Sequence, residues 1–254
     1  MRLIVIILST VLLISCAAQP VSNSGGGSNE RVAQNKEAAA INVELGANYI
    51  STGDYQLANE KLQKAFKQDP NSSVARWTYA ILQEQLKQPE AAETYYKKAI
   101  AINPGDSRGH NVYASFLCRH KRYQEATEHF NKALSNPLFN SRASANLNAG
   151  VCAMEIPDHD LAKGYFAEVI RISPGNRVAI YQLAKLHFLQ KDFATSQSYL
   201  RDFEEVSQHT AKSLWLAYRT ERELGNVRIA QSYAKLLTKQ FPSSYEAEQL
   251  ARIN

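Results

Sequence analysis

Residues 53–70 read GDYQLANEKLQKAFKQDP, and the spacing of small and apolar side chains in this stretch recurs along most of the chain. Ala58 is followed by Leu62 after four residues, by Ala65 after seven and by Pro70 after twelve. The position of Ala58 recurs at intervals of 34 residues, with one interval of 36, at Ala92, Ala126, Ala162, Ser196 and Ala230. A period of this length indicates a tandem array of helical repeats.

The size of the side chains at two further positions explains how such a unit packs. Twelve residues before the Ala58 position a small side chain lets the second helix of the unit approach closely; this position holds Gly46, Ala80, Ala114, Gly150 and Ala184, with Tyr218 as the exception. Four residues after the Ala58 position a larger side chain fills the contact; this position holds Leu62, Tyr96, Phe130, Phe166 and Leu200, with Ala234 as the exception. One unit cannot bury its own apolar faces, so neighbouring units stack into one core.

This pattern resembles the tetratricopeptide repeat, whose unit is a pair of antiparallel helices. The resemblance predicts an all-α fold, a right-handed superhelix of six helix–turn–helix repeats over about residues 39–244 with a capping helix at Tyr245–Asn254. We expect residues 30–254 to form this single domain. The interval of 36 places two additional residues in Asn136–Ser141, where we expect a longer connection.

The first residues have the layout of an export signal. A positively charged start precedes the apolar run Leu3–Ile14, which is too short to span a bilayer as a helix. Leu13–Cys16 resembles the lipobox of bacterial lipoproteins, which predicts removal of residues 1–15 and acyl groups on Cys16. An ordinary signal peptide with an incidental cysteine is the alternative. By the same resemblance, Ala17 in place of an aspartate favours the periplasmic face of the outer membrane.

Residues 16–29 are expected to form the lipidated start of the mature chain and a flexible tether. The stretch after the cysteine holds proline, serines, asparagines and three consecutive glycines, and it carries no charge. A flexible chain of this length has a root-mean-square reach of roughly 20 Å. The folded body would then stay close to the membrane without being embedded in it.

Cys118 and Cys152 lie 34 residues apart, in the first helices of the third and fourth predicted repeats. These helices are neighbours in the stack, and a compartment outside the cytoplasm favours disulfides. We therefore expect a Cys118–Cys152 disulfide, which would contribute roughly 3–4 kcal/mol in the chain-entropy description. Two buried thiols that act as small apolar side chains are the alternative.

Composition and motifs argue against several classes of function. The mature chain would carry 28 basic and 24 acidic side chains, a net charge of +4, without a basic run interleaved with aromatic residues. We therefore expect no nucleic-acid partner. No phosphate-binding glycine loop, Gly-x-Ser-x-Gly elbow, His-Glu-x-x-His or Cys-x-x-Cys motif is present, so we predict no enzyme activity, no cofactor and no small-molecule substrate. His110, His120 and His129 are spaced by 10 and 9 residues, which does not suit a metal site on one helix.

Function in such an array is expected on the concave surface formed by the first helices. At the N-terminal end we predict an apolar partner-binding groove lined by Val43, Ala47, Ile50, Trp77 and Ile81, with Trp77 as the anchor. Two alternatives remain open: the first three side chains pack on a helical start at Glu30–Ala38, or Trp77 belongs to the core. Towards the C-terminal end the outward positions hold Tyr181, Lys185, Phe188, Trp215, Arg219 and Arg222.

Several segments together closely resemble the PilF/PilW family of type IV pilus biogenesis lipoproteins. They are Leu13–Cys16, the repeat motifs Gly53–Ala58 and Arg122–Ala126, the segment Tyr113–Cys118, and Cys152 one repeat later. The resemblance implies a non-catalytic pilotin that binds the pilus secretin and promotes its outer-membrane localisation and multimerisation. The alternatives are another periplasmic adaptor, serving barrel assembly or cell-wall enzymes, and an enzyme whose site the sequence does not reveal.

Cys16→Ala removes the predicted site of acylation. We expect the variant to leave the membrane pellet for the soluble fraction, because the lipid is the predicted attachment of the chain to the membrane. Immunoblotting of separated membrane and soluble fractions measures this. A variant that still pellets with the outer membrane would contradict lipid anchoring.

Overall fold

The computed structural model of this chain describes residues 26–157 and 159–253, and all regular secondary structure in these ranges is helical. The thirteen helices of the described ranges are α1 (Gly26–Thr52), α2 (Tyr55–Gln68), α3 (Ser73–Gln85), α4 (Pro89–Ile102), α5 (Ser107–Arg119), α6 (Tyr123–Leu134), α7 (Arg142–Ala153), α8 (His159–Ile172), α9 (Arg177–Leu189), α10 (Phe193–Val206), α11 (Ala211–Glu223), α12 (Val227–Gln240) and α13 (Tyr245–Ile253).

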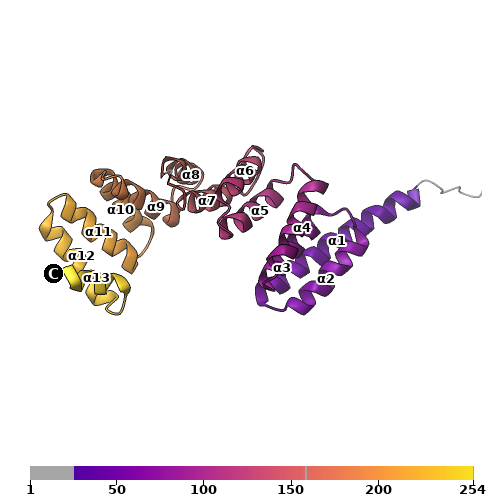
Figure 1. Cartoon of the computed structure of the whole chain (residues 1–254), viewed down its shortest axis with the longest axis horizontal. Coiled ribbons are helices and arrows are strands. Elements are labelled where there is room, and N and C mark those ends of the chain that lie inside the picture. Colours follow the sequence, from indigo (N-terminus) through magenta and orange to yellow (C-terminus); the bar gives the residue numbers. More distant parts are fainter. Residues whose placement is uncertain (1–25, 158, 254) are drawn as a thin grey trace, which may run out of the picture.

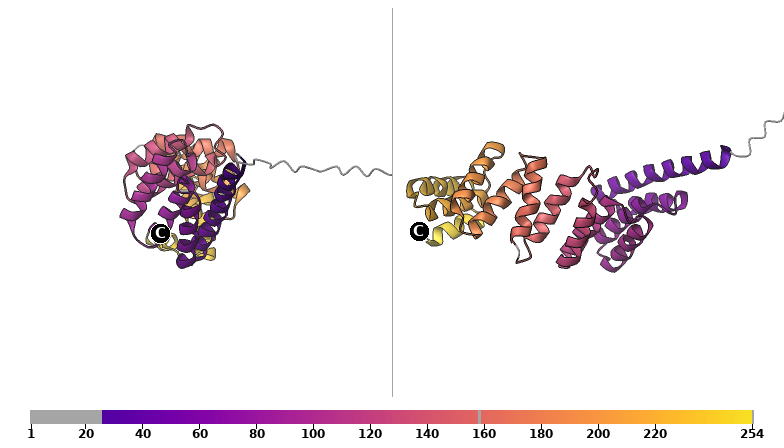
Figure 2. Two further views of the ribbon diagram at one scale, coloured as in Figure 1. Left: turned by 90° about the vertical axis from the view of Figure 1, so that its right-hand side faces the viewer. Right: turned by 90° about the horizontal axis from the view of Figure 1, so that it is seen from above.

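Consecutive helices form antiparallel pairs that stack into an elongated array (Figure 1). The odd-numbered helices are the first helices of the pairs, and neighbouring first helices such as α1 and α3 pack against each other. Seen end-on, the helices wind around a common axis (Figure 2). The predicted superhelix of six helix–turn–helix repeats is therefore confirmed, and α13 packs against α11 and α12 as the predicted capping helix.

The helical part of the chain begins earlier than the sequence suggested. Residues 26–29, expected in the tether, belong to α1, and residues 28–37 of this helix are exposed to solvent. This stem extends beyond the array (Figure 2). Its helical hydrogen bonds continue from the packed part of α1, and adding a residue to an existing helix needs no new nucleation.

The predicted signal and Cys16 lie outside the described residues. Within the described ranges, every helix is too short or too polar to cross a membrane.

A close contact between two side-chain positions holds each helix pair together. A Cβ atom on Gly150 of α7 would lie only 2.7 Å from the Phe166 ring of α8, and a Cβ atom on Gly46 of α1 would lie 2.8 Å from Leu62 of α2. Phe166 and Leu62 are both fully buried. The small residue on the first helix therefore sets how near the second helix can come.

The sixth repeat reverses the sizes at these two positions. Tyr218 of α11 stands where the other repeats have a small residue, and Ala234 of α12 stands where they have a large one. Both belong to the same packed cluster, and Tyr218 is only 4% exposed. The two exceptions in the sequence pattern are thus one exchange of a large and a small side chain across the same contact.

The connection between α6 and α7, Asn136–Ser141, contains the two additional residues and is held in place from both sides. Phe139 is buried between the two helices. Arg142 donates from Nη1 to the carbonyl oxygens of Leu134 at 2.6 Å and Asn136 at 3.1 Å. The first bond satisfies the Leu134 carbonyl, which the end of α6 leaves without a helical partner.

An ion-pair cluster ties the second repeat to the third. Arg122, which precedes α6, donates to Glu93 of α4 at 2.7 Å and to Glu125 at 2.6 Å. Lys97 lies 2.8 Å from Glu93, and the Tyr113 hydroxyl donates to the same carboxylate at 3.1 Å. Although partial burial raises the pKa of Glu93, these hydrogen bonds hold it at about 2.

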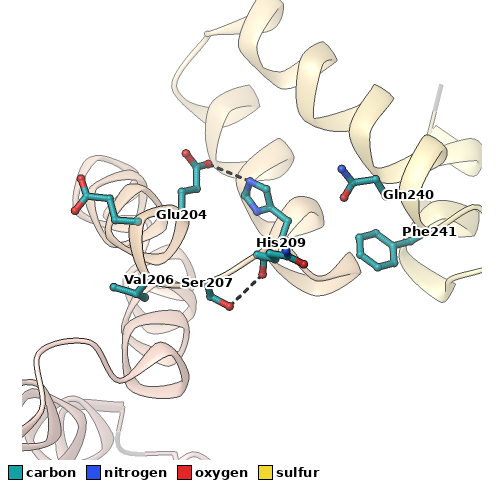
Figure 3. A pocket seen from close by; sticks show the side chains of 8 residues that line it. Glu204, Val206, Ser207, His209, Gln240 and Phe241 are labelled. Carbon is teal, nitrogen blue, oxygen red and sulfur yellow. Dashed lines mark hydrogen bonds and ion pairs between the residues drawn. The ribbon is translucent and has the colours of Figure 1, made fainter.

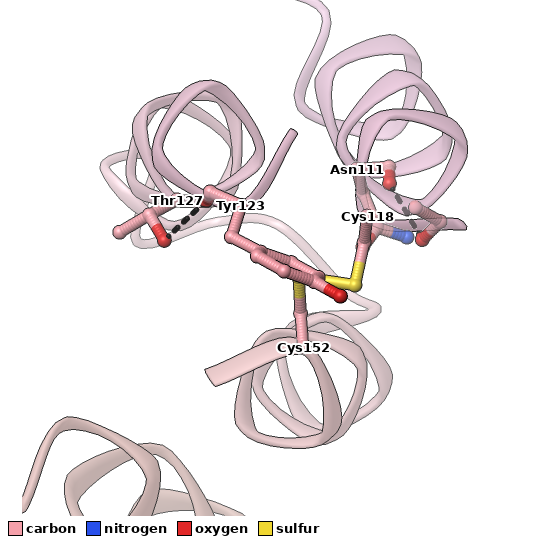
Figure 4. Close-up of a disulfide and its surroundings, with 6 residues drawn as sticks. Asn111, Cys118, Tyr123, Thr127 and Cys152 are labelled. Atoms are coloured by element: carbon pink, nitrogen blue, oxygen red, sulfur yellow. Dashed lines mark hydrogen bonds between the residues drawn. A yellow bond between two sulfur atoms is a disulfide. The ribbon is translucent and has the colours of Figure 1, made fainter. Parts of the chain in front are cut away.

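A disulfide joins Cys118 of α5 to Cys152 of α7, with their Cα atoms 5.8 Å apart. The Tyr123 ring lies against the bridge (Figure 4), in the cluster that also contains Phe116 and Phe130. The bridge crosses the joint between the third and fourth repeats, which also carries the longer connection. It therefore restrains the part of the array in which the repeat period is interrupted.

Thiol alkylation tests the bridge in solution. We expect Cys118 and Cys152 to remain unmodified when the unreduced chain is denatured, and both to react after reduction. Mass spectrometry of the alkylated peptides measures this. We also expect Cys152→Ser to lower the free energy of unfolding by roughly 2–5 kcal/mol. Two reactive thiols before reduction would contradict the disulfide.

Gly150→Ala tests the close contact within the helix pair. The new methyl group would overlap the buried Phe166 ring, so we expect a loss of about 1–3 kcal/mol in the free energy of unfolding. Gly164→Ala is the matched control, because this α8 position is exposed and a Cβ there would meet nothing within 4 Å. The control should gain about 0.5–1 kcal/mol. Urea unfolding measures both, and equal midpoints would contradict the packing argument.

Candidate functional site

An open pocket of about 480 Å³ lies on the concave surface between α1, α3 and the start of α5. We call it the N-terminal groove. Its walls include Ala40, Val43, Ala47, Val74, Trp77 and Arg108. Because these side chains come from the first helices of three successive repeats, the groove exists only in the stacked array.

The surface of the N-terminal groove is apolar, with charges around it. Val43 is only 7% exposed and forms part of its floor, whereas Val74 is 41% exposed. Exposed Lys36 and Glu44 of α1 and exposed Arg108 of α5 bring charges to the lining, which also includes Asp69, Ser72 and Thr78. An apolar strip with charged side chains around it suits the apolar face of a strand or of an amphipathic helix.

Trp77 is fixed in the groove by a hydrogen bond. Its indole Nε1–H donates to Oδ2 of Asp106 at 3.2 Å, and the hydroxyl of Ser73 donates to the same oxygen at 3.1 Å. Asp106 also caps α5, because its Oδ1 accepts from the Gly109 amide at 3.0 Å. Trp77 is partly buried against the cluster that includes Ala80. It is therefore both a wall of the groove and a part of the packing between repeats.

The structure brings together three of the five side chains that the sequence assigned to the groove. Val43, Ala47 and Trp77 line it, whereas Ile50 packs on the cluster of the first repeat and Ile81 on that of the second and third. The alternative that Val43, Ala47 and Ile50 pack on a preceding helical start at Glu30–Ala38 is wrong, because that stretch is an earlier part of the same helix α1.

Sequence reasoning missed three side chains of the groove that the repeat itself could have revealed. Ala40, Val74 and Arg108 are spaced by 34 residues and hold the same position in three successive repeats. They lie one turn before Val43, Trp77 and the equivalent position of the third repeat. The hydrogen bond between Asp106 and Trp77 was harder to predict. An aspartate before a helix indicates an N-cap, but it does not indicate that the same carboxylate also accepts from a tryptophan.

Two of the three histidines of the third repeat meet in the structure. The Nδ1 atoms of His110 and His129 lie 2.8 Å apart, and His110 Nε2 lies 3.0 Å from the Pro104 carbonyl oxygen. A carbonyl only accepts, so His110 carries its proton on Nε2 and accepts at Nδ1 from His129. Burial lowers the pKa of both rings, that of His129 to about 4, helped by the charges of His110 and Lys132. In the described ranges no third metal-ligating side chain joins them, so the pair is a packing contact between α5 and α6.

A hollow of about 820 Å³ lies at the joint between α10 and α11, where the repeat has Gln208 in place of proline (Figure 3). Its polar groups are largely paired with one another. Glu204 accepts from the Tyr233 hydroxyl at 2.6 Å and lies 3.4 Å from His209 Nε2. His209 Nδ1 lies 3.3 Å from the Ser213 hydroxyl. The polar side chains of this hollow therefore bond largely to one another at a joint between two repeats.

The sequence matches tetratricopeptide-repeat families and one named pilus protein. Tetratricopeptide-repeat models match residues 49–116 and 117–177. The chain is 27% identical over 213 residues to type IV pilus assembly protein PilF of Pseudomonas aeruginosa, a match that covers 84% of each chain. An uncharacterised protein of Haemophilus influenzae is 29% identical over 154 residues, which are 61% of this chain and 83% of that protein.

Comparison with solved structures also shows similarity to type IV pilus proteins. The fold superposes on Pseudomonas aeruginosa PilF with a TM-score of 0.78 at 26% identity, over 87% of this chain and 100% of that chain. It superposes on PilW, described as a widely conserved type IV pilus biogenesis factor, with a TM-score of 0.73 at 28% identity, over 84% of this chain and 98% of that chain. The likeness therefore extends over nearly the whole of both relatives.

Proposed function

This chain is a tetratricopeptide-repeat protein homologous to PilF, and on that premise we propose that it acts in type IV pilus biogenesis. The homology with PilF over 84% of each chain is the observation that carries the proposal. The structural match to PilF and PilW supports it, because the arrangement of all repeats is shared rather than a single motif.

The proposed role is that of a pilotin for the pilus secretin. In this role the acylated Cys16 anchors the chain at the periplasmic face of the outer membrane, and the repeat array holds a secretin subunit. The chain thereby promotes the localisation of the secretin and its assembly into multimers. The mechanism is binding and delivery, and no covalent step is required of the protein.

The N-terminal groove is the proposed contact for the secretin. Its apolar strip between α1 and α3 is open to solvent and offers Ala47, Val74 and Trp77 to a partner. Burying apolar surface there would contribute about 25 cal/mol for each Å² removed from water. Trp77 is already oriented by Asp106, so little side-chain entropy is lost when a partner binds.

Deletion of the gene tests the role. Secretin multimers resist heat and detergent, so we expect immunoblots of outer membranes to lose the multimer band while the monomer remains. Wild-type chain supplied in trans should restore the band. Unchanged multimers would overturn the pilotin role and favour a different periplasmic adaptor.

Val74→Glu tests the contact within the same assay. Val74 lies in the first turn of α3 and is exposed, so a glutamate there leaves the fold intact but places a charge in the apolar groove. We expect secretin binding to weaken by at least about tenfold and the multimer band to fall. Val227→Glu is the matched control, since Val227 is an exposed first-turn valine of α12, outside the groove. Wild-type binding by the Val74 variant would place the contact elsewhere.

A further inference from the structure

Towards its C-terminal end the concave surface carries arginines beside aromatic rings, in contrast to the apolar N-terminal groove. A pocket of about 470 Å³ lies between α11 and α13, lined on the α11 side by Trp215, Tyr218, Arg219 and Arg222. Phe188 of α9 adjoins it, because the Arg219 guanidinium lies 4.5 Å above the Phe188 ring. We call Phe188, Trp215, Tyr218, Arg219 and Arg222 the C-terminal patch.

Aromatic rings hold both arginines of the C-terminal patch in place. The Arg219 guanidinium lies 4.5 Å from the Phe188 ring centre and 5.9 Å from the Trp215 ring centre. The Arg222 guanidinium lies 5.8 Å from the Tyr218 ring, and its Nη1 donates to the Tyr218 hydroxyl at 3.1 Å. Stacking uses the flat face of a guanidinium and leaves N–H groups along its edge for another acceptor.

The positive charges of this patch are not neutralised within the described residues. Arg219 and Arg222 are exposed, and no carboxylate of those residues forms an ion pair with either within 4.0 Å. Glu223 lines the same pocket without pairing to them. Arg122 and Arg171 each form an ion pair with a neighbouring glutamate, whereas Arg201 and Arg228, like the two patch arginines, form none with a described carboxylate. The two oriented guanidinium groups are thus free to form ion pairs with the carboxylates of a partner.

A third positive charge extends the patch along the concave surface. Lys185 of α9 is exposed and, like the two arginines, forms no ion pair with a carboxylate of the described part of the chain. It lies one helical turn before Phe188. Lys185, Arg219 and Arg222 therefore present three positive charges beside aromatic walls on adjacent first helices, α9 and α11.

We propose that the C-terminal patch binds an acidic segment of another protein chain, in which aspartate or glutamate side chains alternate with apolar ones. Carboxylates would accept pairs of hydrogen bonds from the free edge of Arg219 and from the N–H groups of Arg222 that do not bond to Tyr218, and neighbouring apolar side chains would pack on Trp215. A peptide fits better than a membrane surface, because the pocket is a recess between two helices and a flat layer of headgroups reaches such a recess poorly.

A peptide selection tests this proposal independently of any secretin. A library of random dodecapeptides displayed on phage is selected on the purified chain, and each recovered peptide is then measured by fluorescence anisotropy. We expect peptides rich in Asp and Glu whose affinity falls at least about tenfold in the double variant Arg219→Gln/Arg222→Gln. Their affinity should also fall as the salt concentration rises.

The matched control is Arg201→Gln/Arg228→Gln, which removes the same charge from exposed positions on the second helices α10 and α12. This control should bind the selected peptides like the wild type, and circular dichroism should show equal helix content in all three proteins. The proposal is overturned if no peptide distinguishes the two double variants, or if those that do are not acidic. It is also overturned if the patch variant loses sedimentation with phosphatidylglycerol vesicles and no acidic peptide binds.

Discussion

The structure depends on one steric constraint, the close approach of the two helices in each repeat. Gly150 lies so near Phe166, and Gly46 so near Leu62, that a single added methyl group would overlap the partner. This spacing sets the position of every second helix, and the first helices then align into a concave surface. The exchange of sizes at Tyr218 and Ala234 shows that the constraint applies to the pair of positions and not to either residue alone.

Covalent and ionic contacts act on top of this packing where the array is least regular. The period is interrupted between the third and fourth repeats, and the disulfide between Cys118 and Cys152 spans that joint. The neighbouring joint, between the second and third repeats, carries the Glu93–Arg122 ion pair. A solenoid transmits force only between neighbouring repeats, so extra bonds at two successive joints stiffen the middle of the array.

The repeat period made the fold predictable, because the same spacing of small and large side chains recurs in successive helix pairs. The sequence did not reveal the helical stem of α1, since Gly26 and Gly27 are poor helix formers and their helix continues from a packed segment further along the chain. The groove was predicted only in part. Ile50 and Ile81 lie on the same helix faces as the groove residues Val43 and Trp77, but their side chains pack between repeats. Which side chains on such a face stay open to a partner depends on the curvature of the array, which the repeat period does not encode.

The concave surface therefore offers two different chemistries at opposite ends of one rigid array. The N-terminal groove is apolar and lies next to the stem of α1, whose first residue follows Cys16 by only ten positions. The C-terminal patch carries oriented arginines at the other end, beside α13 (Figure 1). If Cys16 is acylated, the apolar site lies nearer the membrane and the cationic site farther from it. A partner that used both sites would be held in a fixed direction along the array, which binding to one site alone would not impose.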